Sequence, residues 1–104
     1  MKRTRIALSE AAASDILEQA DWYDARSENK LAERWERAVS KTLLRIAARP
    51  LSGMRCGFKA KELAGVRRMS VAGFPKHLVF YQVSAKETLV LRIVHGARDL
   101  ESLF

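Results

Sequence analysis

The chain has 104 residues, 48% of them apolar, and a formal net charge of +7. This length and composition are typical of one folded domain, so we expect a single domain over residues 1–104 and exclude a disordered chain. The lone Cys56 excludes an internal disulfide or a cysteine metal cluster, and the lack of a signal pattern or long apolar run predicts a soluble cytoplasmic protein without a membrane partner.

The first half of the sequence predicts a strand followed by two helices. Residues Arg3 to Leu8 have strand character, and Ser9 is a suitable N-cap for a helix that begins there. Apolar residues then recur at helical spacing as far as Tyr23, and a second helical period runs from Leu31 to Ile46. The short break between them predicts a helical hairpin whose two apolar faces pack on the same layer.

The second half predicts a sheet. Leu51 to Ala64 contains two glycines and several basic residues, and we expect an irregular connection there. Val66 to Val71, Lys76 to Val83 and Thr88 to His95 are rich in β-branched and aromatic residues, which predicts three successive antiparallel strands. The expected fold class is α+β, in the order β-α-α-β-β-β, with the helical hairpin on one face of a small antiparallel sheet and the other face partly open.

Positive charge is concentrated in part of the sequence. Residues 53–86 contain seven Lys or Arg residues and a single acidic residue, Glu62. A surface of this sign attracts nucleic acid or an acidic protein, and charge alone does not choose between them.

Two segments near the end of the chain carry a family resemblance. They are Phe74-Pro75-Lys76-His77-Leu78-Val79-Phe80-Tyr81-Gln82-Val83 and Leu89-Val90-Leu91-Arg92-Ile93-Val94-His95-Gly96-Ala97-Arg98-Asp99-Leu100. Together with the Arg49-Pro50 helix end and the early Asp15-Ile16 pair, they resemble the RelE/ParE toxin superfamily, and the ParE branch most closely. The resemblance implies a toxin of a type II toxin-antitoxin module that a cognate acidic antitoxin neutralises in a hetero-oligomer.

The resemblance leaves two targets open. ParE-like members inhibit DNA gyrase, whereas RelE-like members cut mRNA on the ribosome, and a shared fold cannot decide between these activities. RelE-like toxins carry an arginine that contacts phosphate where this chain has Leu78. We therefore expect a gyrase-binding protein without catalytic residues, cofactor or metal. In the ribonuclease alternative, the working residues are Lys59, Lys61, Arg67, Tyr81 and His95.

His95 has the acid-base chemistry that catalysis requires, but its strand position favours a structural role. By alternation it shares a face with Leu89, Leu91 and Ile93, which we expect to point toward the helices, while Arg92 points to the open face. We expect His77, at the start of its strand, to be a solvated surface residue.

Partner-binding candidates fall into two groups. The candidates for target binding are Arg67, Arg92, Arg98, Leu103 and Phe104. The candidates for antitoxin binding are Trp22, Tyr23, Trp35, Arg68 and Arg92. Several have structural alternatives: the three helix aromatics can be core residues, Arg98 can form a local ion pair with Asp99, and the last two residues can fold back on the sheet.

Overall fold

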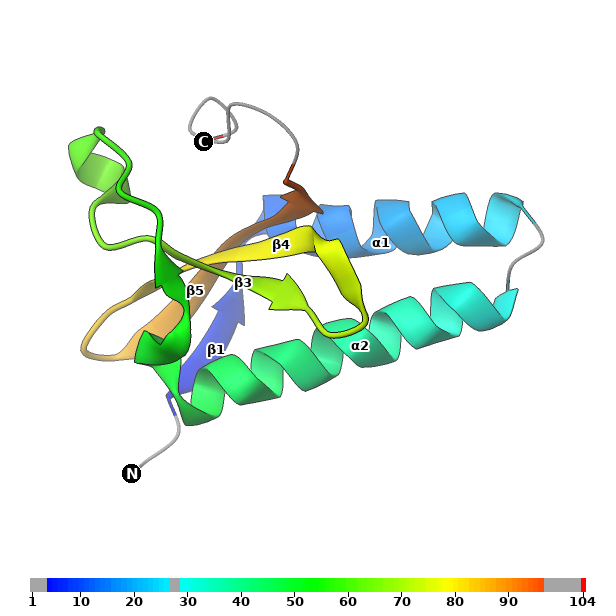
Figure 1. Ribbon diagram of the computed structural model, residues 1–104, viewed down its shortest axis with the longest axis horizontal. Helices are drawn as coiled ribbons and strands as arrows, with labels where there is room; N and C mark the ends of the chain where they lie inside the picture. The colour runs from blue at the N-terminus through cyan, green and yellow to red at the C-terminus, as the bar shows by residue number, and fades with distance from the viewer. Residues whose placement is uncertain (1–3, 27–28, 97–103) are drawn as a thin grey trace.

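The computed structural model describes residues 4–26, 29–96 and 104 of the chain. Two α-helices cover one face of a five-stranded sheet (Figure 1). In chain order, with η marking a 3₁₀ helix, the elements are β1 (Arg5–Leu8), α1 (Glu10–Ala25), α2 (Asn29–Ala48), η1 (Pro50–Ser52), β2 (Met54–Arg55), η2 (Lys61–Leu63), β3 (Arg67–Val71), β4 (Phe74–Val83) and β5 (Glu87–His95). The α+β fold predicted from the sequence is confirmed, and neither α-helix is long and apolar enough to cross a lipid bilayer.

The sheet is mixed rather than purely antiparallel. Its strand order is β1-β5-β4-β3-β2, and β1 pairs in parallel with β5 while all other pairs are antiparallel. A parallel pair needs a long crossover, and here the helical hairpin and the three strands after it supply one. The expectation of an antiparallel sheet was wrong for this one pair, because strand patterning in the sequence does not specify the direction of a partner 82 positions away.

The connection after α2 is more ordered than its composition predicts. Segment Leu51 to Ala64 contributes to η1, forms the short edge strand β2 and includes η2. The Gln82 side chain donates hydrogen bonds to the carbonyl oxygens of Glu62 (3.1 Å) and Ala64 (2.9 Å). The connection is thereby fixed to β4, and this side of the sheet is partly covered.

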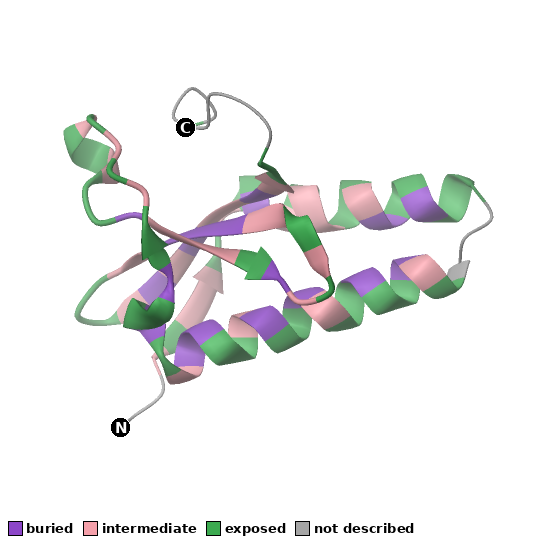
Figure 2. Cartoon of the chain, viewed as in Figure 1, coloured by how far each residue is buried: buried purple, intermediate pink, exposed green. Residues whose placement is uncertain are grey.

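The core lies between the helical hairpin and the sheet (Figure 2). Trp35 of α2 is fully buried at its centre, and the indole Nε1–H donates to the carbonyl oxygen of Ile16 on α1 (3.1 Å). Small residues such as Ala12 and Ala20 are buried on α1, which allows the helices to approach closely. From the sheet, the fully buried members of this core are Val71, Val79, Tyr81 and Val90.

A bulge in β5 changes which side chains face the helices. Phe80 pairs with Arg92 and Tyr81 pairs with Val90, so Leu91 is an extra residue without a cross-strand partner. The alternation of side chains between the two faces of the sheet therefore reverses at Leu91. Val90 is buried, whereas Leu89 and Leu91 are only partly buried. The expected helix-facing set was right for Ile93 and wrong for Leu89 and Leu91. The prediction assumed that side chains alternate without interruption along the strand, and this assumption does not allow for a bulge.

Candidate functional site

Arg92 is held by a carboxylate of α1. Its Nε donates to Oδ2 of Asp15 at 2.8 Å and its Nη2 donates to Oδ1 at 2.9 Å, which is a bidentate ion pair. The backbone N–H of Ile93 also donates to Oδ2 of Asp15 (2.9 Å). The hydrogen bonds that its guanidinium donates to Asp15 raise the pKa of Arg92. Arg92 therefore ties α1 to β5 beyond the end of β1, and it does not project freely as the sequence analysis expected.

Arg67 and Tyr81 support the segment that follows α2. The guanidinium of Arg67 donates to the carbonyl oxygens of Leu51 (3.1 Å) and Gly53 (2.8 Å). The N–H of Gly53 donates to the hydroxyl oxygen of Tyr81 (2.9 Å), and the Tyr81 side chain is fully buried. Burial raises the pKa of Tyr81 above its ordinary value, more than the Gly53 hydrogen bond and the Arg67 charge lower it. The Tyr81 phenol is thus a buried group whose hydroxyl accepts a hydrogen bond from the backbone of the segment after α2.

Among the residues named for a ribonuclease, Arg67 and Tyr81 are cross-strand partners, but Tyr81 and His95 do not converge. Lys59 and Lys61 are exposed in the β2–β3 connection, and Tyr81 is buried beneath Gly53. His95 pairs with His77, four positions along β4 from Tyr81, which is about 13 Å along the strand. General acid-base cleavage needs its acid and base on opposite sides of one phosphate, and Tyr81 and His95 do not meet that geometry.

His77 is not the solvated residue that was expected. Its ring lies edge-on against Trp35, with ring centroids 4.9 Å apart, and 5.5 Å from the ring of the exposed His95. It shares the helix-facing side of β4 with Val79 and Tyr81 because these positions alternate. Burial, with a smaller contribution from His95, lowers the pKa of His77.

The three helix aromatics have different environments. Trp35 is fully buried and Tyr23 is 8% exposed, so both are core residues and the structural alternative holds for them. Trp22 is 48% exposed, and the guanidinium carbon of Arg26 lies 3.5 Å from its ring centroid. Of the three, Trp22 alone is accessible to a partner.

The remaining candidates lie on the other side of the sheet or outside the described residues. Arg68 pairs with Phe80, and its Nη2 lies 3.3 Å from the Sδ of Met54 on β2. Phe104 packs against Phe58 and Phe80, with both centroid distances 5.6 Å, so it folds back on the sheet. Two target-binding candidates, Arg98 and Leu103, lie outside the described residues and stay predictions. The described residues include no group of three or more His, Cys, Asp or Glu side chains that could hold a metal ion.

Comparison with known proteins places the chain in a family. A family model described as "ParE toxin of type II toxin-antitoxin system, parDE" matches residues 6–100. The chain belongs to the ParE toxin family. A solved structure described as "Chromosomal ParDE TA system from P. aeruginosa" contains a chain with the same fold, with a TM-score of 0.74 and 17% identity over 91% of this chain and 98% of that one. No curated protein matches the sequence.

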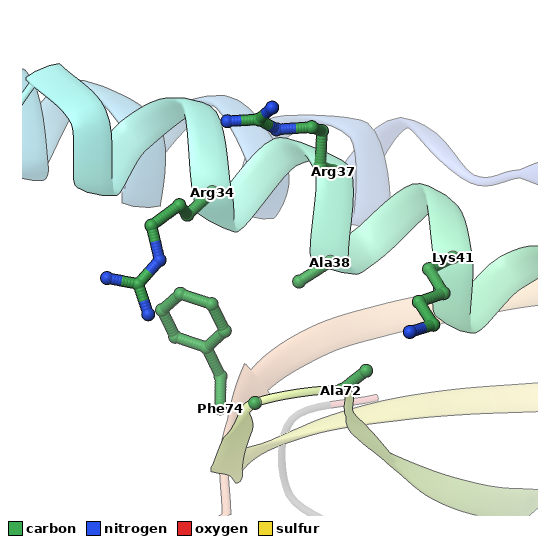
Figure 3. Close-up of a pocket in the computed structure, with 7 residues that line it drawn as sticks. Arg34, Arg37, Ala38, Lys41, Ala72 and Phe74 are labelled. Carbon is green, nitrogen blue, oxygen red and sulfur yellow. The ribbon is translucent and has the colours of Figure 1, made fainter.

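This ParE-family chain also has a basic groove that the sequence analysis missed. Figure 3 shows Arg34 and Lys41 reaching from α2 toward the β3–β4 turn, where Phe74 lies, while Arg37 extends along the outer side of the helix. Together with Ala38, Ala72 and Gly73 they line a shallow hollow of about 340 Å³. The available signal was the spacing of the α2 cations by three or four positions, which puts them on one helix face.

Proposed function

We propose that this ParE-family chain is a growth-inhibiting toxin that a cognate acidic antitoxin holds inactive in a hetero-oligomeric complex. The family match over residues 6–100 supports the toxin assignment, and the likeness to a chain of a ParDE system supports an antitoxin partner. The net charge of +7 favours an acidic partner on electrostatic grounds. Trp22, together with Leu17 on the same helix, offers exposed apolar surface for that partner.

We further propose that the target is DNA gyrase and that the chain inhibits it by binding. The observation that carries this choice is the burial of Tyr81 under Gly53, far along the strand from His95, because it leaves the ribonuclease alternative without an assembled acid-base pair. Of the proposed target-contact residues in the described part, Arg67 and Arg92 are engaged internally. Phe104 is 39% exposed and remains the accessible candidate.

Induction of this chain alone in a bacterial host tests the target. The measurement is the output of a DNA-damage reporter together with the rate of protein synthesis during the first minutes. Gyrase inhibition predicts a rise in the damage response while translation continues. Early collapse of translation without a damage signal contradicts the gyrase proposal.

The ribonuclease alternative predicts that single substitutions of its proposed catalytic residues affect toxicity. It requires that toxicity fall sharply when His95 or Lys61 is replaced by Gln, since both are exposed and neither substitution disturbs the core.

Co-purification of the chain with the product of an adjacent acidic reading frame tests the antitoxin independently. Failure of such a product to bind or to restore growth argues against the module.

A further inference from the structure

Helix α2 carries a row of five exposed cations. Their spacings are three or four positions, which brings neighbours onto one face of an α-helix. The row consists of Lys30, Arg34, Arg37, Lys41 and Arg45, and is called the α2 basic stripe below. It extends about 22 Å along the helix, from a rise of roughly 1.5 Å per residue. The backbone of α2 fixes this spacing, so the array is already formed before any partner binds.

The charges of the stripe are largely uncompensated. Arg37 lies 4.0 Å from Glu33, and both side chains are more than two-thirds exposed, so solvent screens the pair. The other four cations form no ion pair with any described residue. Glu36 lies about 100° around the helix from Arg37, on another face. The stripe is therefore a continuous positive surface.

The surface hollow beside the stripe can accommodate a row of anionic groups. Arg34 and Lys41 extend over the hollow formed with Phe74 and the β3–β4 turn, about 340 Å³ in volume (Figure 3). A chain of phosphates lying in this hollow would have cations on the α2 side along its length. Arg and Lys side chains make a large share of the contacts to nucleic-acid phosphates.

We infer that the α2 basic stripe binds the phosphate backbone of duplex DNA without reading its sequence. A duplex of about 22 Å presents roughly 13 phosphates, enough to engage every cation of the stripe. An acidic protein partner fits less well, because protein interfaces have an apolar core, which the stripe lacks. Among the exposed large apolar side chains of the described residues, only Leu44 lies on α2.

Salt-dependent binding to a fluorescein-labelled 20-bp duplex tests this inference. Fluorescence anisotropy measures the binding constant of the purified chain between 50 and 200 mM KCl. The test variant is Arg34→Gln/Arg37→Gln/Lys41→Gln, which keeps helix-compatible side chains and removes three charges. Each lost phosphate contact lowers the magnitude of the log–log salt slope by about 0.9, so the slope should fall by about 2.7 and affinity at 50 mM by at least about tenfold.

A variant with the same charge loss elsewhere is the control. Arg55→Gln/Lys76→Gln/Lys86→Gln also removes three exposed cations, none of them on α2. It should retain a slope close to that of the parent chain. Far-ultraviolet circular dichroism checks that both variants keep the parent's helix content.

Three results would overturn the inference. Equal losses in both variants would show that net charge, not the stripe, sets the affinity. An unchanged salt slope in the α2 variant would assign DNA binding to another surface or exclude it. Unchanged DNA binding with weakened antitoxin binding would identify the stripe as a protein interface. The DNA measurement uses neither gyrase nor antitoxin, so its outcome is independent of the proposed function.

Discussion

Gly53 and Tyr81 constrain each other at the scale of single residues. A Cβ added at Gly53 would clash with the Tyr81 hydroxyl and would lie 2.9 Å from the carbonyl oxygen of Arg68. The backbone N–H at the same position donates to that hydroxyl. Glycine is required here for space, since the chain approaches a buried phenol more closely than a side chain permits.

Replacing Gly53 with Ala should lower the free energy of unfolding by about 1–3 kcal/mol, because a packed site must shift to admit the methyl group. The same substitution in a Tyr81→Phe background should cost less, because the hydroxyl that the methyl meets is absent. Urea denaturation of the four chains, followed by tryptophan fluorescence, measures the coupling. Additive costs of the two substitutions would contradict this contact.

Ser9 joins two elements at the scale of secondary structure. Its Oγ accepts from the N–H of Ala12 (3.0 Å), which caps α1, and donates to the carbonyl oxygen of Leu91 (2.8 Å) at the bulge of β5. Its backbone N–H donates to the carbonyl oxygen of Val90 (2.9 Å). One hydroxyl thus gives hydrogen-bond partners to an N–H group at the start of α1 and to a carbonyl oxygen at the bulge of β5.

Ser9→Ala should reduce stability by about 1–3 kcal/mol, because both the cap and the partner of the Leu91 carbonyl are lost. Thermal or urea unfolding of the variant checks this value. Ser14→Ala is the matched control on the exposed side of α1 and should change stability by less than about 0.5 kcal/mol. Equal effects of the two substitutions would argue against the capping role.

Local sequence signals predicted the elements better than their long-range relations. Ser9 and Pro50 marked real boundaries, and the three last strands and both helices appear where the patterning indicated them. Neither the parallel partner of β1 nor the bulge at Leu91 has a local signature, because each depends on a distant strand. At the candidate site, the sequence indicated Arg92 and Tyr81 as candidates but did not predict their contacts with Asp15 and Gly53, which only the folded arrangement brings close.

At the scale of the whole molecule, protonation of one histidine is linked to folding. His77 lies between the helix layer and the sheet, in contact with Trp35 and Phe74 and beside His95. Its pKa is lowered in the folded chain, chiefly by burial, so the unfolded chain binds a proton there more readily. The stability from neutral His77 is complete above the unfolded pKa of about 6.5 and is lost as the pH falls below it.

The free energy of unfolding should therefore decline between pH 7.5 and pH 5.5, and His77→Gln should flatten that decline. Urea titrations of the parent chain and the variant across this range provide the comparison, in which contributions from carboxylates common to both cancel. Parallel pH profiles for the two chains would show that His77 does not supply the linkage.

The pairing of β1 with β5 also limits when, during its synthesis, the chain can complete its fold. Arg5 pairs with Glu87, so the sheet closes only after about 80 further residues have been made. Translation at about 5–20 residues per second separates the two strands by about 4–16 seconds. Contacts between distant strands also fold more slowly than local ones. A nascent chain therefore passes through a period without a complete fold, during which the proposed antitoxin can meet it.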